Sequence, residues 1–184
     1  MAGFRRTRAG IEVKLRAGER GVLRQLIGEV VELLGPGSAV ASADAPADPL
    51  DAMVSIPDTA PAAPTDPVLA RLLPDGYRQD PEAAAEFRRY TEGELRAVKS
   101  ESAARVLADL GGDGPRLLLD EPGAEIWLSV LNDVRLALGT RLSVTEDTYD
   151  ELNRLRSHDP RARALAVYAW LGYLQETLVT AVAR

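Results

Sequence analysis

The sequence predicts a mainly helical (α+β) fold, a bundle of about five helices with a small antiparallel sheet. Apolar residues recur at helical spacing over much of the chain, and three Asp-Pro pairs precede such segments. A short stretch near the start instead alternates apolar and charged residues, which is typical of a half-buried strand. With 184 residues, 46% of them hydrophobic, the chain can bury one core, so we expect a single domain over residues 1–184.

The sheet is predicted from two regions that lie far apart in the sequence. Segments 4–7 and 11–15 flank a turn at residues 9–10, and the apolar residues of the second segment alternate with charged ones. Residues 116–119 lie between a Gly-Pro turn and Asp120, and this stretch is too short for a helix. We therefore expect an amino-terminal hairpin joined by one further short strand.

The first helix and the segment after it differ sharply in composition. Residues 19–34 carry a broad apolar stripe that ends at a Gly-Pro-Gly sequence, which predicts a helix of that length. Alanine, proline, serine and aspartate dominate residues 37–65. This composition predicts a mobile connector, in which the apolar residues of 50–56 are a candidate docking segment.

Aspartate followed by proline marks the start of three further helices. The carboxylate can accept hydrogen bonds from the first turn, where the missing N–H of proline does no harm. The pairs at 66–67, 80–81 and 159–160 predict helices over 67–73, 81–110 and 160–183. Asp120 with a following proline predicts another helix, which runs to residue 142. Thr145 is expected to cap a short helix to residue 156.

Charged and polar residues lie inside the most apolar of these helices. Residues 126–142 are apolar nearly all round, yet they include Asp133 and Arg135. A buried charge needs a partner, so we expect both residues to be largely buried and paired, and Arg135→Ala to cost about 2–4 kcal/mol of stability. The expected partners lie on the long helix and on the last one, where Gln175 is the alternative to Glu176. The predicted cluster comprises Glu86, Arg88, Arg89, Asn132, Asp133, Arg135 and Glu176.

Two interpretations of this cluster stay open. It is either a structural network of ion pairs that fixes the register of the helices, or a carboxylate–arginine site for a ligand. Residues 86–99 of the long helix interleave charged and core-forming side chains, and no catalytic constellation accompanies them. This pattern favours recognition over chemistry.

Charge is unevenly distributed along the chain. The first 24 residues carry seven cations and two anions, a net charge of +5, and the rest carries 15 cations and 26 anions, a net charge of −11. Such a basic end can attract phosphate or an acidic protein surface, whereas the acidic body repels nucleic acid. Direct DNA binding would therefore be weak, and the alternative is a solvated hairpin and helix face. The candidate basic surface is Arg5, Arg6, Arg8, Lys14 and Arg16.

Several classes of site lack the residues they need. The chain has no cysteine and a single histidine, His158, so thiolate catalysis, disulfides and cysteine-bound zinc are excluded. The acidic residues of 146–151 lack the spacing of a calcium loop, and Gly111 to Gly114 lack the residues of a phosphate loop. We expect no catalytic residue, no cofactor and no metal. Without a long apolar run or a signal peptide, we expect a cytoplasmic protein that does not enter the membrane.

Four motifs stand in order along the chain, Asp66 to Tyr77, Glu86 to Lys99, Leu131 to Arg141 and Trp170 to Glu176. Together they resemble an actinobacterial family of oxidative-stress transcriptional regulators. The family, here called AosR-like, was long labelled a domain of unknown function, and its members are often encoded beside the adaptor ClpS. The resemblance covers the chain from the hairpin to the last helix, apart from the connector.

The resemblance implies a non-enzymatic, transcription-associated regulator that acts through a protein partner, such as a sigma factor or another regulator, or through DNA. The gene neighbourhood of the family implies one alternative, a cytoplasmic adaptor or scaffold in protein quality control. The residues themselves leave another open, an enzyme or ligand-binding domain that uses Glu86, Arg88, Asp133 and Arg135. A redox-active cysteine pair is associated with the family's role, and this chain has no cysteine, so thiol sensing is not carried over. The residues leave the oligomeric state open.

Overall fold

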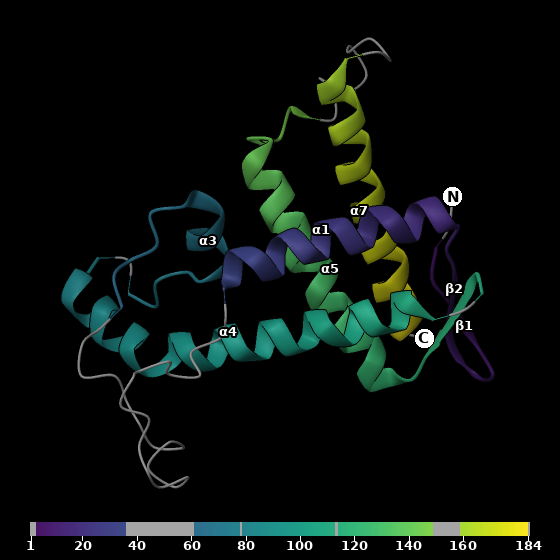
Figure 1. The fold of residues 1–184 in the computed structure, drawn as a ribbon, viewed down its shortest axis with the longest axis horizontal. Helices are drawn as coiled ribbons and strands as arrows, with labels where there is room; N and C mark the ends of the chain where they lie inside the picture. Colours follow the sequence, from purple (N-terminus) through teal and green to yellow (C-terminus); the bar gives the residue numbers. More distant parts are fainter. Residues whose placement is uncertain (1–2, 36–60, 78, 113, 149–158, 184) are drawn as a thin grey trace, which may run out of the picture.

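The computed structural model describes residues 3–35, 61–77, 79–112, 114–148 and 159–183. These residues form five helices and one three-stranded antiparallel sheet, which confirms the predicted fold class (Figure 1). Most of the predicted connector, the candidate docking segment 50–56, most of the predicted helix 145–156 and His158 lie outside the described residues. The single-domain organisation stays a prediction.

The sheet has the predicted strands in the order β1-β2-β3. Strand β1 covers Arg5–Thr7, β2 covers Gly10–Lys14 and β3 covers Arg116–Leu119, and β2 pairs antiparallel with both neighbours. The turn into β2 requires glycine. Gly10 has a φ of 133°, and a Cβ there would lie 2.5 Å from the backbone oxygen of Leu119.

Four of the five helices begin where an aspartate accepts hydrogen bonds from backbone N–H groups of the first turn. Asp66, Asp80 and Asp159 do so before proline, as predicted, and Asp120 does so one residue earlier relative to its proline. The helices are α1 (Ala17–Leu34), α3 (Pro67–Leu72), α4 (Pro81–Gly111), α5 (Glu121–Arg141) and α7 (Pro160–Val182).

Helix α5 is central, because it contacts the other four helices as well as β2 and β3. Trp127 of α5 is fully buried, and its ring meets the ring of Phe4 edge-on at 5.8 Å between centroids. The amino-terminal strand is tied to the last helix: the N–H of Phe4 donates to Thr177 Oγ1 and Arg6 Nε donates to the carbonyl of Ala181, both at 3.1 Å. Phe4 and the carboxyl-terminal end of α7 therefore lie beside the sheet (Figure 1).

Candidate functional site

The inner face of α4 changes character along its length. In the carboxyl-terminal half, Ala103, Val106 and Leu110 are buried in the core. The same stripe continues toward the amino terminus at intervals of three or four residues, but there it is charged. Its members are Arg88 and Glu92, which are 8% and 7% exposed, and Arg96 and Lys99, whose side chains are 17% and 16% exposed.

Each of these buried charges has a partner, as burial requires. Arg88 pairs with the carboxylate of Asp75, and Arg96 Nη2 lies 2.7 Å from Oε1 of Glu92. Lys99 Nζ lies 2.7 Å from Oδ1 of Asp133 on α5. The pairs with Asp75 and Asp133 attach α4 to the turn after α3 and to α5.

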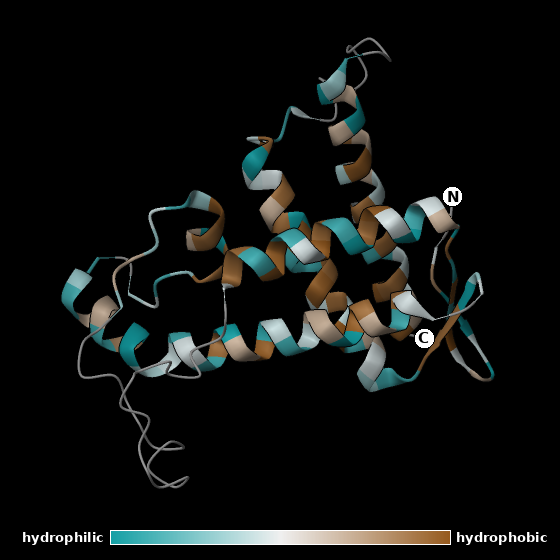
Figure 2. Cartoon of the chain, in the orientation of Figure 1, coloured by the Kyte–Doolittle hydropathy of each residue, from teal (hydrophilic) through white to brown (hydrophobic). Residues whose placement is uncertain are grey.

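The outer side of the same half of α4 carries exposed apolar side chains beside the exposed Glu86 and Glu94. Phe87, Tyr90, Leu95 and Val98 are 37–53% exposed. Tyr77, which precedes α4, is equally exposed and packs edge-on against Phe87 at 6.0 Å between ring centroids. A surface helix usually buries its apolar residues and exposes its charges, so this half of α4 is inverted. In Figure 1 it extends beyond the other helices, and hydrophobic residues recur along it in Figure 2.

A groove of about 350 Å³ lies along this inverted segment. Its carboxylates are the exposed Glu94 and the buried Glu92, whose Oε2 atom has no hydrogen-bond donor within the described part of the chain. The remaining lining is mostly apolar. The groove is lined by Leu73, Pro74, Phe87, Arg88, Thr91, Glu92, Glu94, Leu95 and Val98.

The residues of the predicted cluster do not meet in one place. Glu86 and Arg89 pair with each other on the outside of α4, with 3.3 Å between Oε1 and Nη2, and Arg88 turns toward Asp75. Arg88 precedes Lys99 by 11 residues, about 16 Å along the helix axis. The predicted pairing of Glu86, Arg88 and Arg89 with α5 is therefore wrong, because these residues lie too far toward the amino terminus of α4.

On α5 the prediction is confirmed for Asp133, whereas for Arg135 the expected burial is wrong and the expected partner Gln175 is found. Asp133 is buried and paired, although with Lys99, which the sequence did not single out as its partner. Arg135 is only half-buried and meets no carboxylate among the described residues. Its Nη1 atom donates to Gln175 Oε1 at 3.1 Å, and its guanidinium lies 5.3 Å from the centroid of the Tyr168 ring.

The last two members of the predicted cluster lie at the surface. Asn132 is exposed and accepts a hydrogen bond of 3.4 Å from Gln175 Nε2. Glu176 is exposed and lines a shallow groove together with Arg135 on the outside of α7. Gln175 rather than Glu176 is therefore the partner that α7 offers to α5.

This geometry lowers the expected cost of Arg135→Ala to about 1 kcal/mol, because the substitution removes a hydrogen bond to a neutral amide and a ring contact but strands no buried charge. Urea unfolding followed by circular dichroism measures it, with the exposed Arg163→Ala on α7 as the matched control. A loss of 3 kcal/mol or more would contradict the prediction.

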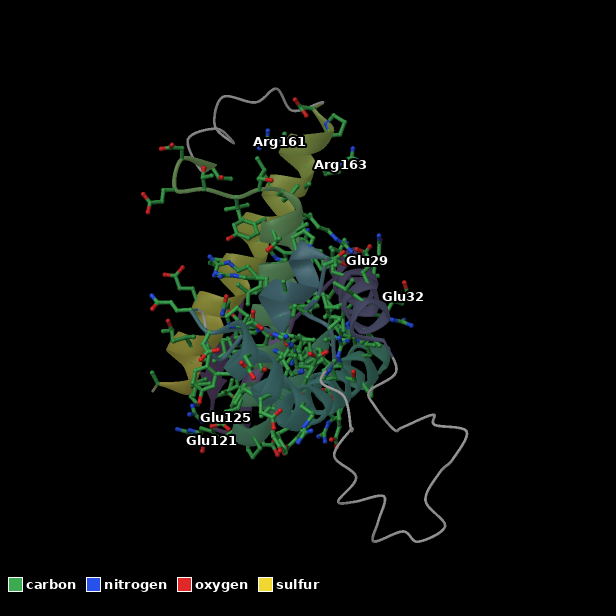
Figure 3. The ribbon with its side chains drawn as sticks, turned by 90° about the vertical axis from the view of Figure 1, so that its left-hand side faces the viewer. Glu29, Glu32, Glu121, Glu125, Arg161 and Arg163 are labelled. Atoms are coloured by element: carbon green, nitrogen blue, oxygen red, sulfur yellow. The ribbon has the colours of Figure 1, made fainter. Side chains whose placement is uncertain are left out.

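Two of the five cations of the predicted basic surface, Arg5 and Arg6, are paired with carboxylates. Arg5 Nη2 lies 2.9 Å from Oε1 of Glu12, and this hydrogen bond, together with the nearby charges of Arg116 and Lys14, lowers the pKa of Glu12. Arg6 pairs with Glu121 at the start of α5, with 3.1 Å between Nη1 and Oε1. Figure 3 labels Glu121. The three other predicted cations, Arg8, Lys14 and Arg16, are exposed.

The described residues offer a surface for recognition. No group of three His, Asp or Glu side chains among them is placed to hold a metal ion. In the same residues, every helix is too short or too polar to cross a lipid bilayer. The exposed apolar side chains of α4 were not predicted from the sequence. One signal could have revealed them: the stripe that is buried at 103, 106 and 110 continues toward the amino terminus through charged residues, which leaves the apolar residues on the other side of the helix.

Comparison with known proteins identifies relatives over nearly the whole chain. The model of a family described as "Domain of unknown function (DUF2017)" matches residues 1–182. The "Oxidative stress regulator AosR" of Mycobacterium tuberculosis strain H37Rv is 34% identical over 174 residues, which cover 88% of this chain and 77% of the relative. The "Putative oxidative stress regulator AosR" of Mycobacterium leprae is 32% identical over 177 residues, which cover 89% and 78%. No solved structure matches.

Proposed function

Because this chain belongs to the DUF2017 family, whose mycobacterial relatives are named oxidative stress regulators, we propose that it is a non-enzymatic regulatory protein that binds a protein partner in the groove along α4. A sigma factor or another transcriptional regulator is the class of partner we propose, and the cytoplasm is the compartment. The observation that carries the proposal is the inverted half of α4.

Exposed aromatic and branched side chains in one patch favour association, because a partner removes their apolar surface from water. Tyrosine is also among the residues that contribute most to interfaces when a partner covers them. Tyr77, which packs against Phe87 of the groove, and Tyr90 are both about half exposed. Beneath this face, the buried pairs of Arg88 and Lys99 attach α4 to its neighbours. The surface is thus held in place before a partner arrives, which reduces the entropy lost on binding.

The charges of the groove indicate the chemistry of the partner. Glu94 is exposed at the groove, whereas Glu92 is buried there and already paired with Arg96. A complementary segment therefore carries apolar side chains for the groove and a lysine or arginine for Glu94. An amphipathic helix with a basic flank meets both requirements, and we propose it as the occupant.

The identity of the bound protein decides between the two regulatory alternatives. A quality-control adaptor would use the same surface, and the identity of the bound protein distinguishes it from a transcriptional regulator. We do not propose the ligand site that the sequence suggested, because Arg88 and Asp133 belong to two different places.

A photo-crosslinking amino acid at position 98 tests the proposal, with the same residue at position 179 as the matched control. Val98 and Val179 are both about half exposed, and they lie on α4 and α7. We expect a protein partner to crosslink at 98 and not at 179. Val98→Glu should then weaken binding of that purified partner by about 30-fold, which corresponds to a contact worth about 2 kcal/mol.

Three results would contradict this. The Val98→Glu variant could bind the partner as well as the natural chain does, or the partner could crosslink equally at both positions. The protein could also crosslink at 98 to a second copy of itself and sediment as a dimer, which would make this face a self-association surface instead.

The absence of cysteine predicts a further result. Peroxide or diamide, at doses too low to oxidise Met1 and Met53, should change neither the electrophoretic mobility, nor the circular dichroism, nor partner binding of the purified protein, because it has no thiol to oxidise. A shift that a reductant reverses would contradict this prediction and would require a redox group other than a cysteine of this chain.

A further inference from the structure

We propose that the free edge of β3 is an interface for a second copy of this chain, which joins two three-stranded sheets into one. Residues 116–120 of the two copies run antiparallel about a two-fold axis at Leu118. This edge is separate from the partner groove. Gly111, the last residue of α4, follows the groove residue Val98 by 13 residues, about 20 Å along the helix axis, and β3 lies beyond it. The inference therefore does not depend on the proposed function.

The backbone of β3 leaves hydrogen-bonding groups unused on one side. The N–H of Leu15 donates to the carbonyl of Pro115 at 2.8 Å, so position 115 and every second residue after it bond to β2. Arg116 and Leu118 therefore direct their N–H and C=O groups away from β2, to the edge of a sheet with the order β1-β2-β3. Among the described helices and strands, only β2 and α5 make extensive contact with β3. Because α5 also contacts β2, it runs back beneath the sheet and not along the edge.

An exposed leucine lies at the middle of this edge. Leu119 is buried, so Leu118 points to the opposite, outer side of the sheet. Leu118 is 57% exposed, the largest value for a large hydrophobic residue in the described part of the chain. An apolar edge strand favours pairing with another chain, because the pairing satisfies its backbone and removes the side chain from water. An axis at this position places the two leucines side by side.

The charges on either side of Leu118 are opposite in sign. Arg116 and Asp120 are both exposed, and Asp120 has an extended backbone, with a φ of −77° and a ψ of 176°. Antiparallel pairing centred on Leu118 places Arg116 opposite Asp120 of the partner subunit, and symmetry forms this pair twice. Within one copy, Arg116 instead lies opposite Lys14 on β2, and like charges in that position destabilise a sheet. The edge is thus complementary in charge to itself.

The backbone groups of the edge also match. The N–H of Leu118 donates to the carbonyl of Leu118 of the partner subunit, and the N–H of Asp120 donates to the carbonyl of Arg116 of the partner subunit. The carbonyl of Asp120 takes no part, because it accepts from the N–H of Ala124 at 3.0 Å in the first turn of α5. Oδ1 of Asp120 accepts from the N–H of Gly123 at 2.8 Å, which leaves Oδ2 for the arginine. This interface is small, so we expect a dimer that dissociates on dilution.

Sedimentation equilibrium of the full chain, over a range of concentrations, tests the interface. We expect a reversible monomer–dimer equilibrium. Leu118→Pro should abolish the dimer and keep the sheet, because β2 does not use the N–H that proline lacks. Arg116→Glu should weaken dimerisation by about tenfold, because it turns both attractive pairs into repulsive ones. Val98→Glu changes the groove of α4 instead, so it is the matched control with unchanged dimerisation. Circular dichroism confirms that each variant is folded.

A cysteine at position 118 tests the register of the pairing. The chain has no cysteine of its own, so Leu118→Cys introduces a single thiol. The Cα atoms of a hydrogen-bonded antiparallel pair lie about 5.5 Å apart, a separation that a disulfide can span. We expect mild oxidation to link Leu118→Cys into a dimer. Val179→Cys, at a position on α7 that is also about half exposed, is the matched control and should stay largely monomeric.

Four results would overturn the proposal. The natural chain could stay a monomer at every concentration, or a folded Leu118→Pro variant could dimerise as the natural chain does. Leu118→Cys could become linked no faster than Val179→Cys. Val98→Glu could dissociate the dimer while Arg116→Glu leaves it intact, which would place self-association at the groove of α4. A monomeric chain that still crosslinks to a protein partner at position 98 would refute this inference and leave the proposed function standing.

Discussion

Lys99→Ala is expected to lower the free energy of unfolding by about 3–5 kcal/mol, because it leaves the carboxylate of Asp133 buried without its cation. The two side chains are 16% and 8% exposed, and 2.7 Å separates Nζ from Oδ1. The pair joins α4 to the central helix, so the stranded charge lies where most elements meet. Urea unfolding followed by circular dichroism at neutral pH measures the loss.

Two further variants complete the experiment. Lys14 is the chain's other lysine and lies exposed on β2, so Lys14→Ala should change stability by no more than about 0.5 kcal/mol. The double variant Lys99→Met with Asp133→Leu removes both charges and should recover most of the loss, because apolar residues of similar volume can replace a buried ion pair. A loss below about 1 kcal/mol for Lys99→Ala would show that Asp133 is solvated or paired differently.

The second large effect is expected for Trp127→Ala, at about 3–5 kcal/mol, because it removes a fully buried indole. The substitution also deprives the Asp109 carboxylate of a hydrogen bond, since indole Nε1–H donates to Oδ2 at 2.8 Å. Phe4, whose ring packs edge-on against the indole, would face the resulting cavity.

Trp170→Ala is the matched control, because it removes the chain's other tryptophan from a partly buried position on α7. We expect a clearly smaller loss there. Circular dichroism is the suitable measurement, since each variant keeps a single tryptophan and their fluorescence cannot be compared directly. Equal losses in the two variants would contradict the central position of Trp127.

The elements of this fold are predictable because their signals are local. The alternation at residues 11, 13 and 15 indicates a strand whatever it pairs with, and β2 is found there. Asp66, Asp80 and Asp159 cap helices with their own side chains, so the helix starts follow from adjacent residues alone.

The contacts between elements are not local, and this explains the errors at the candidate site. Whether Asp133 meets Arg88 or Lys99 depends on how far α4 is shifted along α5, and both residues lie on the same stripe of α4. The position of that stripe also determines which side of α4 faces the solvent. The interleaved pattern of residues 86–99 predicts core-forming side chains there, but Phe87, Leu95 and Val98 are exposed because charged residues of the stripe occupy the inner positions instead.

The sheet has a consequence for how the protein is made. Ile11 pairs with Leu119 on β3, and Arg6 of β1 is bonded to Ala181, so apart from the pairing of β1 with β2 the partners of these strands are synthesised long after the strands themselves. During translation β2 therefore lacks its β3 neighbour, while α1 and α4 form locally. Pairings between such distant residues are slow to form. The edge of the hairpin that later pairs with β3 is thus open to chaperones and to aggregation until residues 116–119 have been synthesised.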